Sequence, residues 1–214
     1  MLIVDDDALV RAGLAMMLGA ADDLEIVGEA EDGSQVLEAV DAHRPDVVLM
    51  DIRMPKVDGL EATRLVCARP GAPQVIVLTT FDVDDHVLTA LRDGAAGFLV
   101  KDTPPTEILR AIRLVAAGDA VLSPAVTRKL VDHMAADDGA AASARAVRLL
   151  GELTEREREV AVAVGQGSSN AEVAAELYMS VATVKAHVSR LLMKLDVDNR
   201  VQVALLVHDA GLSR

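Results

Sequence analysis

The chain has 214 residues, of which 51% are hydrophobic, and its net charge is −13. This length allows one large domain or two small ones, and the negative charge argues against a protein coated in basic surface for nucleic acid. The charge is uneven, because residues 1–120 hold 22 acidic against 10 basic side chains and residues 146–214 hold 9 against 8. Such an asymmetry indicates two domains with different tasks.

Cysteine usage and hydropathy limit the cellular compartment. Cys67 is the single cysteine of the sequence, which excludes an intramolecular disulfide framework and fits a reducing cytosol. No apolar run approaches the roughly 18 residues that a membrane span needs. Met1–Val4 leads straight into acidic residues, unlike a signal peptide. We expect a cytoplasmic protein without a membrane segment.

The first 120 residues alternate short apolar runs with amphipathic segments. Val- and Ile-rich runs without polar alternation are typical of buried parallel strands, and alternation with helices predicts a parallel sheet covered on both faces. The expected strands are Leu2–Val4, Glu25–Ala30, Val47–Met50, Val75–Thr79 and Gly97–Val100, and helix-like segments include Ala8–Leu18, Ser34–Ala42 and Asp84–Arg92. Five repeats favour a small doubly wound α/β domain with five strands over an eight-stranded barrel.

The rest of the chain lacks strand-like runs. A helix is expected from Ser123 to about Met134, followed by a linker of small residues at 135–144. Four short helices then predict a small all-α domain, at about Thr154–Gln166, Ser169–Leu177, Val181–Leu195 and Arg200–Ala210, with Thr154 and Glu157 as a capping box. The predicted boundaries are 1–120 for the first domain, 121–147 for the helix and linker, and 148–214 for the second domain.

Polar residues end the predicted strands. Asp5, Asp6 and Asp7 follow the first strand, Asp51 the third, Thr79 the fourth and Lys101 the fifth. The ligand site of an open parallel sheet lies at the carboxyl ends of its strands, so these side chains should converge. Crowded carboxylates repel one another, and Mg²⁺ relieves the repulsion while keeping water and phosphate oxygens as ligands. An aspartate in such a site can accept a phosphoryl group.

The motifs that carry these residues resemble the receiver domain of two-component response regulators over about residues 1–120. They are Val4–Asp7, Leu49–Pro55, Asp58-Gly59, Val77–Thr80 and Gly97–Asp102. The resemblance implies a flavodoxin-like fold in which Asp51 accepts a phosphoryl group from a sensor histidine kinase. It also implies that Asp5, Asp6, Asp51 and the backbone carbonyl of Arg53 bind Mg²⁺, that Thr79 and Lys101 contact the phosphoryl oxygens, and that Thr79 and Phe98 form the switch.

Each of these residues has an ordinary reading when it stands alone. An aspartate after a strand is usually a cap, a lysine is usually at the surface, and Phe98 is equally well a core residue. The order of the strand ends, together with Met54-Pro55 and Asp58-Gly59 after the acceptor, favours the receiver. The same resemblance implies that Arg53 and Phe81 shield the phosphoryl group from water, that compact Thr80 admits the donor, and that the phosphorylated state is long-lived.

Residues of about 150–214 resemble the helix-turn-helix of the LuxR/NarL family. The matching pieces are Leu153–Glu157, Asn170–Ala174, Ser180–His187 and Lys194-Leu195. The apolar stripe of Val181–Leu195 leaves a polar face for a DNA major groove. The resemblance implies base-facing positions at Lys185, Ala186 and Ser189 and phosphate contacts at Thr183, His187 and Arg190, with Lys194 on the same face.

The near-neutral second domain predicts weak DNA binding by one copy, because each phosphate contact adds salt-dependent affinity. A homodimer formed on activation would double the contacts. The resemblance places the dimer face on the last helix, which is rich in apolar residues, with Val203, Leu206 and Val207 as the expected contacts.

The two resemblances together imply a DNA-binding transcriptional regulator, which is not an enzyme except that it catalyses its own phosphorylation and dephosphorylation. Three other functions compete with this one. A phosphatase of the haloacid-dehalogenase type would carry its nucleophile after the first strand and more chain for a cap. A receiver-like regulator that never sees phosphate does not need Asp6, Asp51, Thr79 and Lys101 together. RNA or single-strand binding needs a stacking platform, and the sequence has only Phe81, Phe98 and Tyr178 as aromatic residues.

Overall fold

The computed structural model describes residues 1–79, 86–122 and 140–212. The chain divides into two compact units. The first comprises Met1–Ala117 and Val121–Lys129, and the second comprises Gly118–Ala120 and Leu130–Arg214. The helix expected at 123–134, the first half of the expected linker and Phe81 with Thr80 lie outside the described residues. Among the described residues, no helix is both long and apolar enough to cross a membrane.

The first unit is built on a parallel sheet with the strand order β2-β1-β3-β4-β5-β6. Its strands are β1 (Leu2–Val4), β2 (Gly28–Ala30), β3 (Val47–Asp51), β4 (Gln74–Thr79), β5 (Gly97–Val100) and β6 (Val121–Leu122). The five expected strands are present in the expected order along the chain. The sixth strand has only two residues and extends the sheet beside β5, so this edge continues past the five strands that the sequence indicated.

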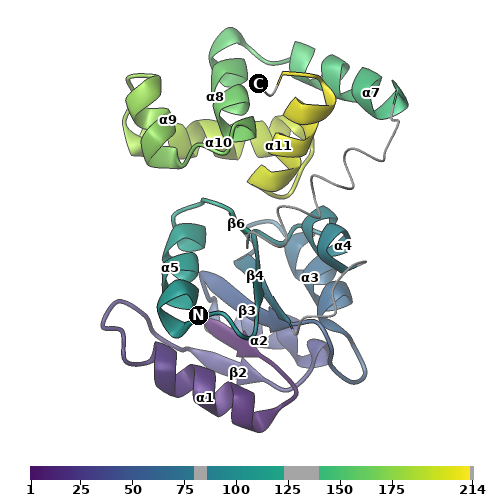
Figure 1. Cartoon of the computed structure of the whole chain (residues 1–214). Coiled ribbons are helices and arrows are strands. Elements are labelled where there is room, and N and C mark those ends of the chain that lie inside the picture. The colour runs from purple at the N-terminus through teal and green to yellow at the C-terminus, as the bar shows by residue number, and fades with distance from the viewer. Residues whose placement is uncertain (80–85, 123–139, 213–214) are drawn as a thin grey trace. The chain divides into compact units, whose positions relative to one another are not determined.

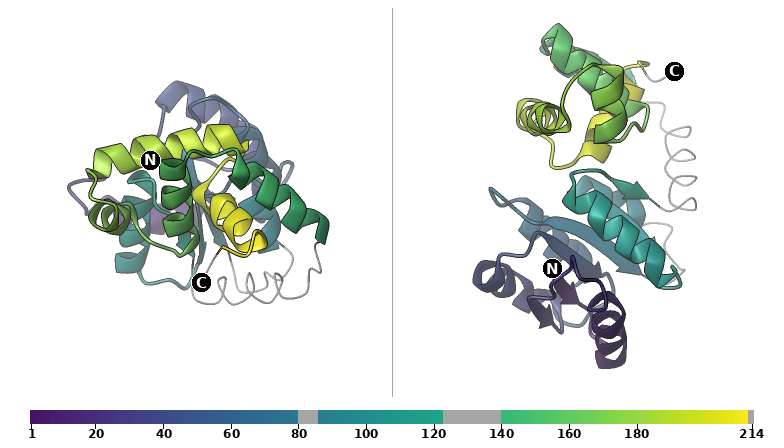
Figure 2. Two further views of the ribbon diagram at one scale, coloured as in Figure 1. Left: turned by 90° about the horizontal axis from the view of Figure 1, so that it is seen from above. Right: turned by 90° about the vertical axis from the view of Figure 1, so that its left-hand side faces the viewer.

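Helices cover both faces of this sheet (Figures 1 and 2). The helices of the unit are α1 (Ala8–Leu18), α2 (Val36–His43), α3 (Gly59–Cys67), α4 (His86–Arg92) and α5 (Pro105–Ala116), with a short 3₁₀ helix η1 (Gly33–Gln35) before α2. α1 contacts α5, while α3 contacts both α2 and α4. The central strands are therefore buried on both sides, as their unbroken apolar sequences predict.

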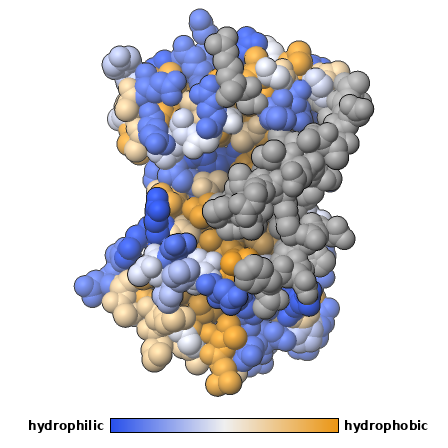
Figure 3. All heavy atoms as spheres, viewed as in Figure 1, coloured by the Kyte–Doolittle hydropathy of each residue, from blue (hydrophilic) through white to orange (hydrophobic). Residues whose placement is uncertain are grey.

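Side chains of α1 and α5 form one continuous core with one face of the sheet. Because side chains alternate between the two faces of a strand, Ile3 and Leu49 lie in this core, with Leu14 of α1 and Ile112 of α5. α1 also keeps large apolar side chains at the surface, namely Leu9, Met16 and Met17. Figure 3 shows apolar atoms at the lower edge of the unit, where α1 lies. The helix therefore lacks the polar outer face of an ordinary amphipathic helix.

The second unit is a helical domain around its own core. Its helices are α7 (Ala140–Gly151), α8 (Glu155–Gly165), α9 (Asn170–Glu176), α10 (Val181–Leu195) and α11 (Arg200–Asp209). The core is formed mainly by α8, α9, α10 and α11. Thr154 and Ser169 begin α8 and α9 as capping boxes with Glu157 and Glu172, which satisfies backbone N–H groups that a helix start otherwise leaves unpaired.

The expected linker is wrong from Ala140 onward. α7 begins there, packs against α11, and buries Ala146 and Leu150. Its first turn contains only alanine and serine, which are small residues without a strong capping signal, but alanine is also the best helix former. The apolar residues Ala146 and Leu150, four positions apart, give the helix the inward face that stabilises it.

Candidate functional site

Three carboxylates converge at the carboxyl ends of β1 and β3. Carboxylate oxygens of Asp5, Asp6 and Asp51 all lie within 4.8 Å of one another. Asp5 is 1% exposed and Asp51 is 5% exposed, whereas Asp6 is exposed to solvent. The sheet brings them together because β1 and β3 are adjacent parallel strands, with Val4 beside Met50, so that the residues following them leave the same edge.

Lys101 joins two of these carboxylates. Its Nζ lies 2.7 Å from Asp5 Oδ2 and 3.0 Å from Asp51 Oδ2. The remaining oxygens of the pair accept backbone hydrogen bonds: Asp51 Oδ1 from the N–H of Ile52 at 2.9 Å, and Asp5 Oδ1 from the N–H of Asp7 at 2.9 Å. Both buried carboxylates are therefore held in fixed orientations.

The electrostatics of the cluster favour a cation. Burial raises the pKa of Asp51, the ammonium of Lys101 opposes this rise, and the negative charge of Asp5 adds to it, so the net pKa lies above the ordinary value. Burial alone would lower the pKa of Lys101, but hydrogen bonds to Asp5 and Asp51 leave it raised. One ammonium among three carboxylates leaves excess negative charge, and the hard oxygen ligands present fit Mg²⁺.

Of the two expected switch residues, Thr79 lies at a strand end beside Lys101, and Phe98 lies inside the sheet. Thr79 ends β4 and is 3% exposed, and its carbonyl accepts a 2.6 Å hydrogen bond from the N–H of Lys101. The hydroxyl-bearing and ammonium-bearing residues therefore leave adjacent strands at the same edge. Phe98 lies three residues before Lys101 and is fully buried, on the face opposite to Leu99.

The loop after Asp51 carries the remaining expected ligand, Arg53, whose side chain is exposed. Gly59 closes this loop onto β3: its N–H donates to Ile52 O at 2.8 Å, and a Cβ at this position would stand 1.8 Å from Asp51 O. Only glycine allows so close an approach of two backbones, which explains why Gly59 follows Asp58 in the loop after Asp51. Phe81 and Thr80, expected to flank the phosphoryl group, lie outside the described residues.

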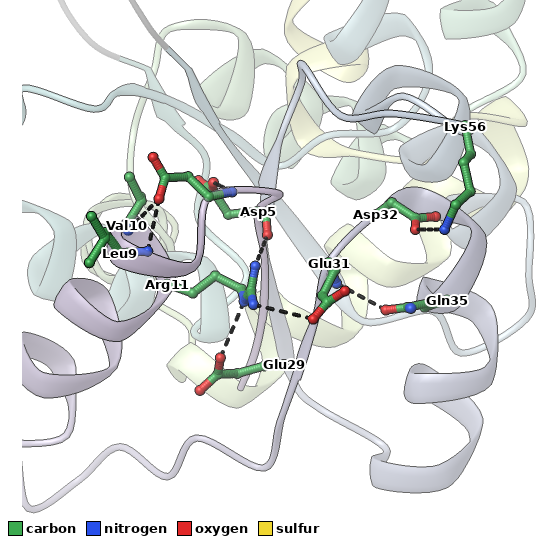
Figure 4. Close-up of polar contacts among 10 residues, drawn as sticks. Asp5, Leu9, Val10, Arg11, Glu29, Glu31, Asp32, Gln35 and Lys56 are labelled. Carbon is green, nitrogen blue, oxygen red and sulfur yellow. Dashed lines mark hydrogen bonds and ion pairs between the residues drawn. The ribbon is translucent and has the colours of Figure 1, made fainter.

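Arg11 belongs to the neighbourhood of the acidic cluster, and the sequence reasoning missed it. The guanidinium donates from Nη1 to the backbone carbonyl of Asp5 at 2.6 Å and from Nε to Glu29 at 3.3 Å, and its Nη2 lies 3.6 Å from Glu31 (Figure 4). The side chain is only 10% exposed. A signal existed, because Arg11, Leu14 and Leu18 recur at helical spacing on the buried stripe of α1.

Asp32 and Lys56 form a second polar contact that the sequence reasoning missed. Lys56 Nζ lies 2.7 Å from Asp32 Oδ2, and Asp32 also accepts from the backbone N–H and hydroxyl of Ser34. The bonds from Lys56 and Ser34 lower the pKa of Asp32 to about 2. Lys56 follows Met54-Pro55 in the loop after Asp51, so this contact ties that loop to the turn after β2 (Figure 4).

In the second unit, α10 presents most of the residues expected to meet DNA. Ser180 caps the helix by accepting from the N–H of Thr183 at 3.1 Å, and Val184, Val188, Leu191 and Leu195 form the buried face. The exposed residues of the expected set are Thr183, Lys185, Ala186, Ser189, Arg190 and Lys194. This face therefore carries the polar groups on one side of a single helix, as a groove-binding helix requires.

One member of the expected DNA-binding set is paired within the unit, and another is half-buried. Lys194 Nζ lies 2.8 Å from Glu157 Oε2 of the α8 capping box, and this contact together with the hydrogen bonds of Thr154 lowers the pKa of Glu157 to about 2. His187 is half-buried and its Nδ1 is shielded from solvent. The structure therefore gives Lys194 a partner that any DNA phosphate must displace.

The expected dimer face on α11 needs correction. Val203 and Val207 are 1% and 0% exposed and belong to the core of the unit. A Cβ added to Gly165 of α8 would stand 2.4 Å from Val207 Cγ1, so α8 and α11 pack at very short range here. Leu206 is half-buried. Two valines of the proposed contact set are consumed by folding and are unavailable to a partner.

Both units match families of known proteins. The family model described as response regulator receiver domain matches residues 1–113, and the model described as bacterial regulatory proteins, luxR family, matches residues 151–207. The transcriptional regulatory protein LiaR of Bacillus subtilis (strain 168) is 37% identical over 207 residues, which cover 97% of this chain and 95% of the relative.

Two further relatives match over nearly the whole chain. The nitrate/nitrite response regulator protein NarL of Escherichia coli (strain K12) is 34% identical over 207 residues, covering 97% of this chain and 94% of the relative. The crystal structure of the response regulator ChrA of a heme-sensing two-component system is 36% identical, with a TM-score of 0.53, covering 99% of this chain and 96% of that one. The similarity therefore includes both units and their order.

Proposed function

Because the chain belongs to the two-component response regulators that join a receiver domain to a LuxR-type DNA-binding domain, we propose that Asp51 is its phosphoacceptor. The observation that carries the proposal is the convergence of Asp5, Asp6 and Asp51 around the ammonium of Lys101. A phosphoryl group passes from a histidine nitrogen of a sensor kinase to a carboxylate oxygen of Asp51. The bond from that nitrogen to phosphorus breaks as the bond from oxygen to phosphorus forms.

Each residue of the site has a task in this transfer. Lys101 and the backbone N–H of Ile52 hold the Asp51 carboxylate for attack, and Lys101 with Thr79 then faces the oxygens of the transferred group. Asp5, Asp6, Asp51 and the carbonyl of Arg53 would hold Mg²⁺, which neutralises charge on the phosphoryl oxygens when it is bound. Phe98, buried three residues before Lys101, is the candidate for passing the change at Thr79 into the core.

Labelling with acetyl phosphate tests the acceptor. We expect one phosphoryl group on Asp51, formed only in the presence of Mg²⁺, and none on Asp51→Asn. Asp46→Asn is a matched control, since Asp46 is an exposed aspartate just before β3 and its replacement should leave labelling unchanged. Equal labelling of Asp51→Asn and the wild type would contradict the assignment.

We propose that the regulatory output is promoter binding by the exposed face of α10, which places the work of the protein in the cytoplasm. Lys185, Ala186 and Ser189 would face base edges, and Thr183, His187 and Arg190 would contact phosphates. The weak positive charge of this face supports a homodimer as the binding species, because two copies double the phosphate contacts. Phosphorylation of Asp51 would favour that dimer.

A pair of lysine variants tests the DNA face. Lys185 is exposed, so Lys185→Met should weaken DNA binding, whereas Lys194→Met removes the ion pair with Glu157 and should affect DNA binding less. A lost base contact costs about 1–3 kcal/mol. Gel-shift titrations of the phosphorylated variants at one salt concentration measure the difference. A larger loss for Lys194→Met than for Lys185→Met would contradict the proposed face.

A further inference from the structure

The edge strand β2 and the turn after it contact both loops that carry the proposed Mg²⁺ ligands (Figure 4). Glu29 and Glu31 hold Arg11, which bonds to the Asp5 carbonyl, and Asp32 holds Lys56 in the loop after Asp51. We call the three carboxylates Glu29, Glu31 and Asp32 the edge bracket. None of the three lies in the group of carboxylates able to share a metal ion, so the bracket acts on the site only through the loops.

The first arm of the bracket fixes the loop after β1. The N–H of Asp5 donates to Ala30 O at 3.2 Å, while the carbonyl of Asp5 accepts from Arg11 Nη1 at 2.6 Å. Because the carbonyl of Asp5 and the N–H of Asp6 share one planar peptide, the Arg11 bond sets the plane from which the exposed carboxylate of Asp6 projects. The planar guanidinium has the donors to serve Asp5, Glu29 and Glu31 at once.

The second arm fixes the loop after β3. Lys56 has a φ of 61°, a left-handed conformation that costs free energy for a residue with a side chain and persists where surrounding contacts determine it. Those contacts are the 2.7 Å ion pair with Asp32 and, one residue on, the 3.1 Å bond from the N–H of Gly33 to Val57 O. The carbonyl of Arg53, three residues before Lys56, lies in the same loop.

We propose that Arg11 and Lys56 are positioning residues through which the edge bracket sets the Mg²⁺ affinity of the receiver. This inference rests on the proposed function, since it concerns the same metal site. Positioning and charge predict opposite results. Each residue is a cation near a cluster that binds a cation, so its removal should strengthen Mg²⁺ binding if only its charge acts. If it positions a ligand-bearing loop, its removal should weaken binding, as the loss of groups that orient metal ligands does.

Isothermal titration of the full chain with Mg²⁺ measures the sign directly. We expect Arg11→Met and Lys56→Met to bind Mg²⁺ about tenfold more weakly than the wild type. Arg64→Met is the matched control, because Arg64 is an exposed arginine of α3 paired with Glu61, and its removal takes away one positive charge without touching either loop. Equal or tighter binding by both bracket variants would overturn the proposal.

A second measurement separates positioning from a general loss of structure. The initial rate of labelling by acetyl phosphate is followed as a function of Mg²⁺ concentration. Mispositioned ligands should raise the Mg²⁺ concentration for half-maximal rate about tenfold and leave the rate at saturating Mg²⁺ near that of the wild type. A lower saturating rate with an unchanged half-maximal concentration would overturn the positioning role.

Failure of the bracket and failure of the proposed function give different results. If the wild type bound no Mg²⁺ or were labelled without it, the proposed site itself would be wrong. If the wild type bound Mg²⁺ and Arg11→Met and Lys56→Met bound it equally well, only the bracket would be wrong. Arg11→Lys adds a further check, because a single ammonium keeps the charge but not the fork and should therefore fail to restore wild-type affinity.

Discussion

At the scale of single residues, Asp51 is placed where its charge opposes folding. Its pKa is raised by burial and by Asp5 more than Lys101 lowers it, so the folded protein releases this proton less readily than the unfolded chain. The contribution of Asp51 to stability is therefore fully present below the unfolded pKa of about 4 and is lost as the pH rises through the folded pKa. The group that the proposed phosphoryl transfer needs is thus retained at a cost in stability.

This sign leads to a prediction for Asp51→Asn. Asparagine does not ionise, so without Mg²⁺ at pH 7 we expect the variant to unfold at a higher temperature than the wild type. The difference should shrink as the pH falls through the folded pKa of Asp51 and be gone below about 4, where Asp51 is neutral in both the folded and the unfolded state. Thermal unfolding at several pH values measures this difference.

Mg²⁺ at a hundredfold excess over its Kd should raise the unfolding free energy of the wild type by about 2.7 kcal/mol. It should raise the unfolding free energy of Asp51→Asn by less.

Gly59, at the end of the loop after Asp51, gives a second prediction at this scale. A Cβ at Gly59 would stand 1.8 Å from Asp51 O, so Gly59→Ala must push α3 away from β3 and should cost at least about 2 kcal/mol. Gly13 of α1 has nothing within 4 Å of its would-be Cβ, and Gly13→Ala should stabilise the helix by about 0.5–1 kcal/mol. Urea unfolding of both variants tests the contrast. A small loss in Gly59→Ala would mean that the loop yields easily.

At the scale of elements, the turn between α9 and α10 stores backbone strain. Tyr178 has a φ of 53° and is 96% exposed, so its ring gains little from packing while its backbone occupies a region that costs about 1 kcal/mol for an ordinary residue. Asparagine tolerates this region better. We expect Tyr178→Asn to raise the unfolding free energy by about 1 kcal/mol, measured by chemical denaturation. Tyr178→Ala, which removes the ring but keeps the strain, should show no such gain.

The helix α1 shows why some elements resist prediction of their faces. It buries Arg11 with Leu14 and Leu18 and exposes Leu9 and Met16. Hydropathy alone would therefore predict the wrong face of α1 to be buried, because the charged residue is inside and apolar residues are outside. Glu29, Glu31 and the carbonyl of Asp5 make burial of Arg11 possible, because they supply the polar partners without which a buried guanidinium is not tolerated.

At the scale of the whole molecule, two separate cores predict two unfolding transitions. The receiver core lies between its sheet and α1 and α5, and the DNA-binding unit has its own core, which includes Leu150 of α7. In calorimetry Mg²⁺ should raise only the receiver transition. Leu150→Ala, at a fully buried side chain, should cost about 2–5 kcal/mol in the other transition. A shift of the Mg²⁺-sensitive transition by Leu150→Ala would contradict this division.

The sequence by itself determined the fold class and which polar groups meet at the carboxyl ends of the strands. Strand-like runs ending in Asp5, Asp51, Thr79 and Lys101 fix which groups meet, because parallel strands deliver their carboxyl ends to one edge whatever the details of packing. The capping box of α8 is equally local, since Thr154 and Glu157 lie three residues apart and need no distant partner.

Only the tertiary structure decided which of the other charged side chains form ion pairs and which of the apolar side chains are buried. Arg11 and Lys56 find their partners on β2 and the turn after it, Lys194 finds Glu157 on another helix, and Val203 and Val207 enter the core against α7 and α8. These contacts join residues distant in sequence, and periodicity reports only that a side chain is apolar or charged. Whether it packs inward, pairs or stays free depends on which neighbour the fold brings within reach.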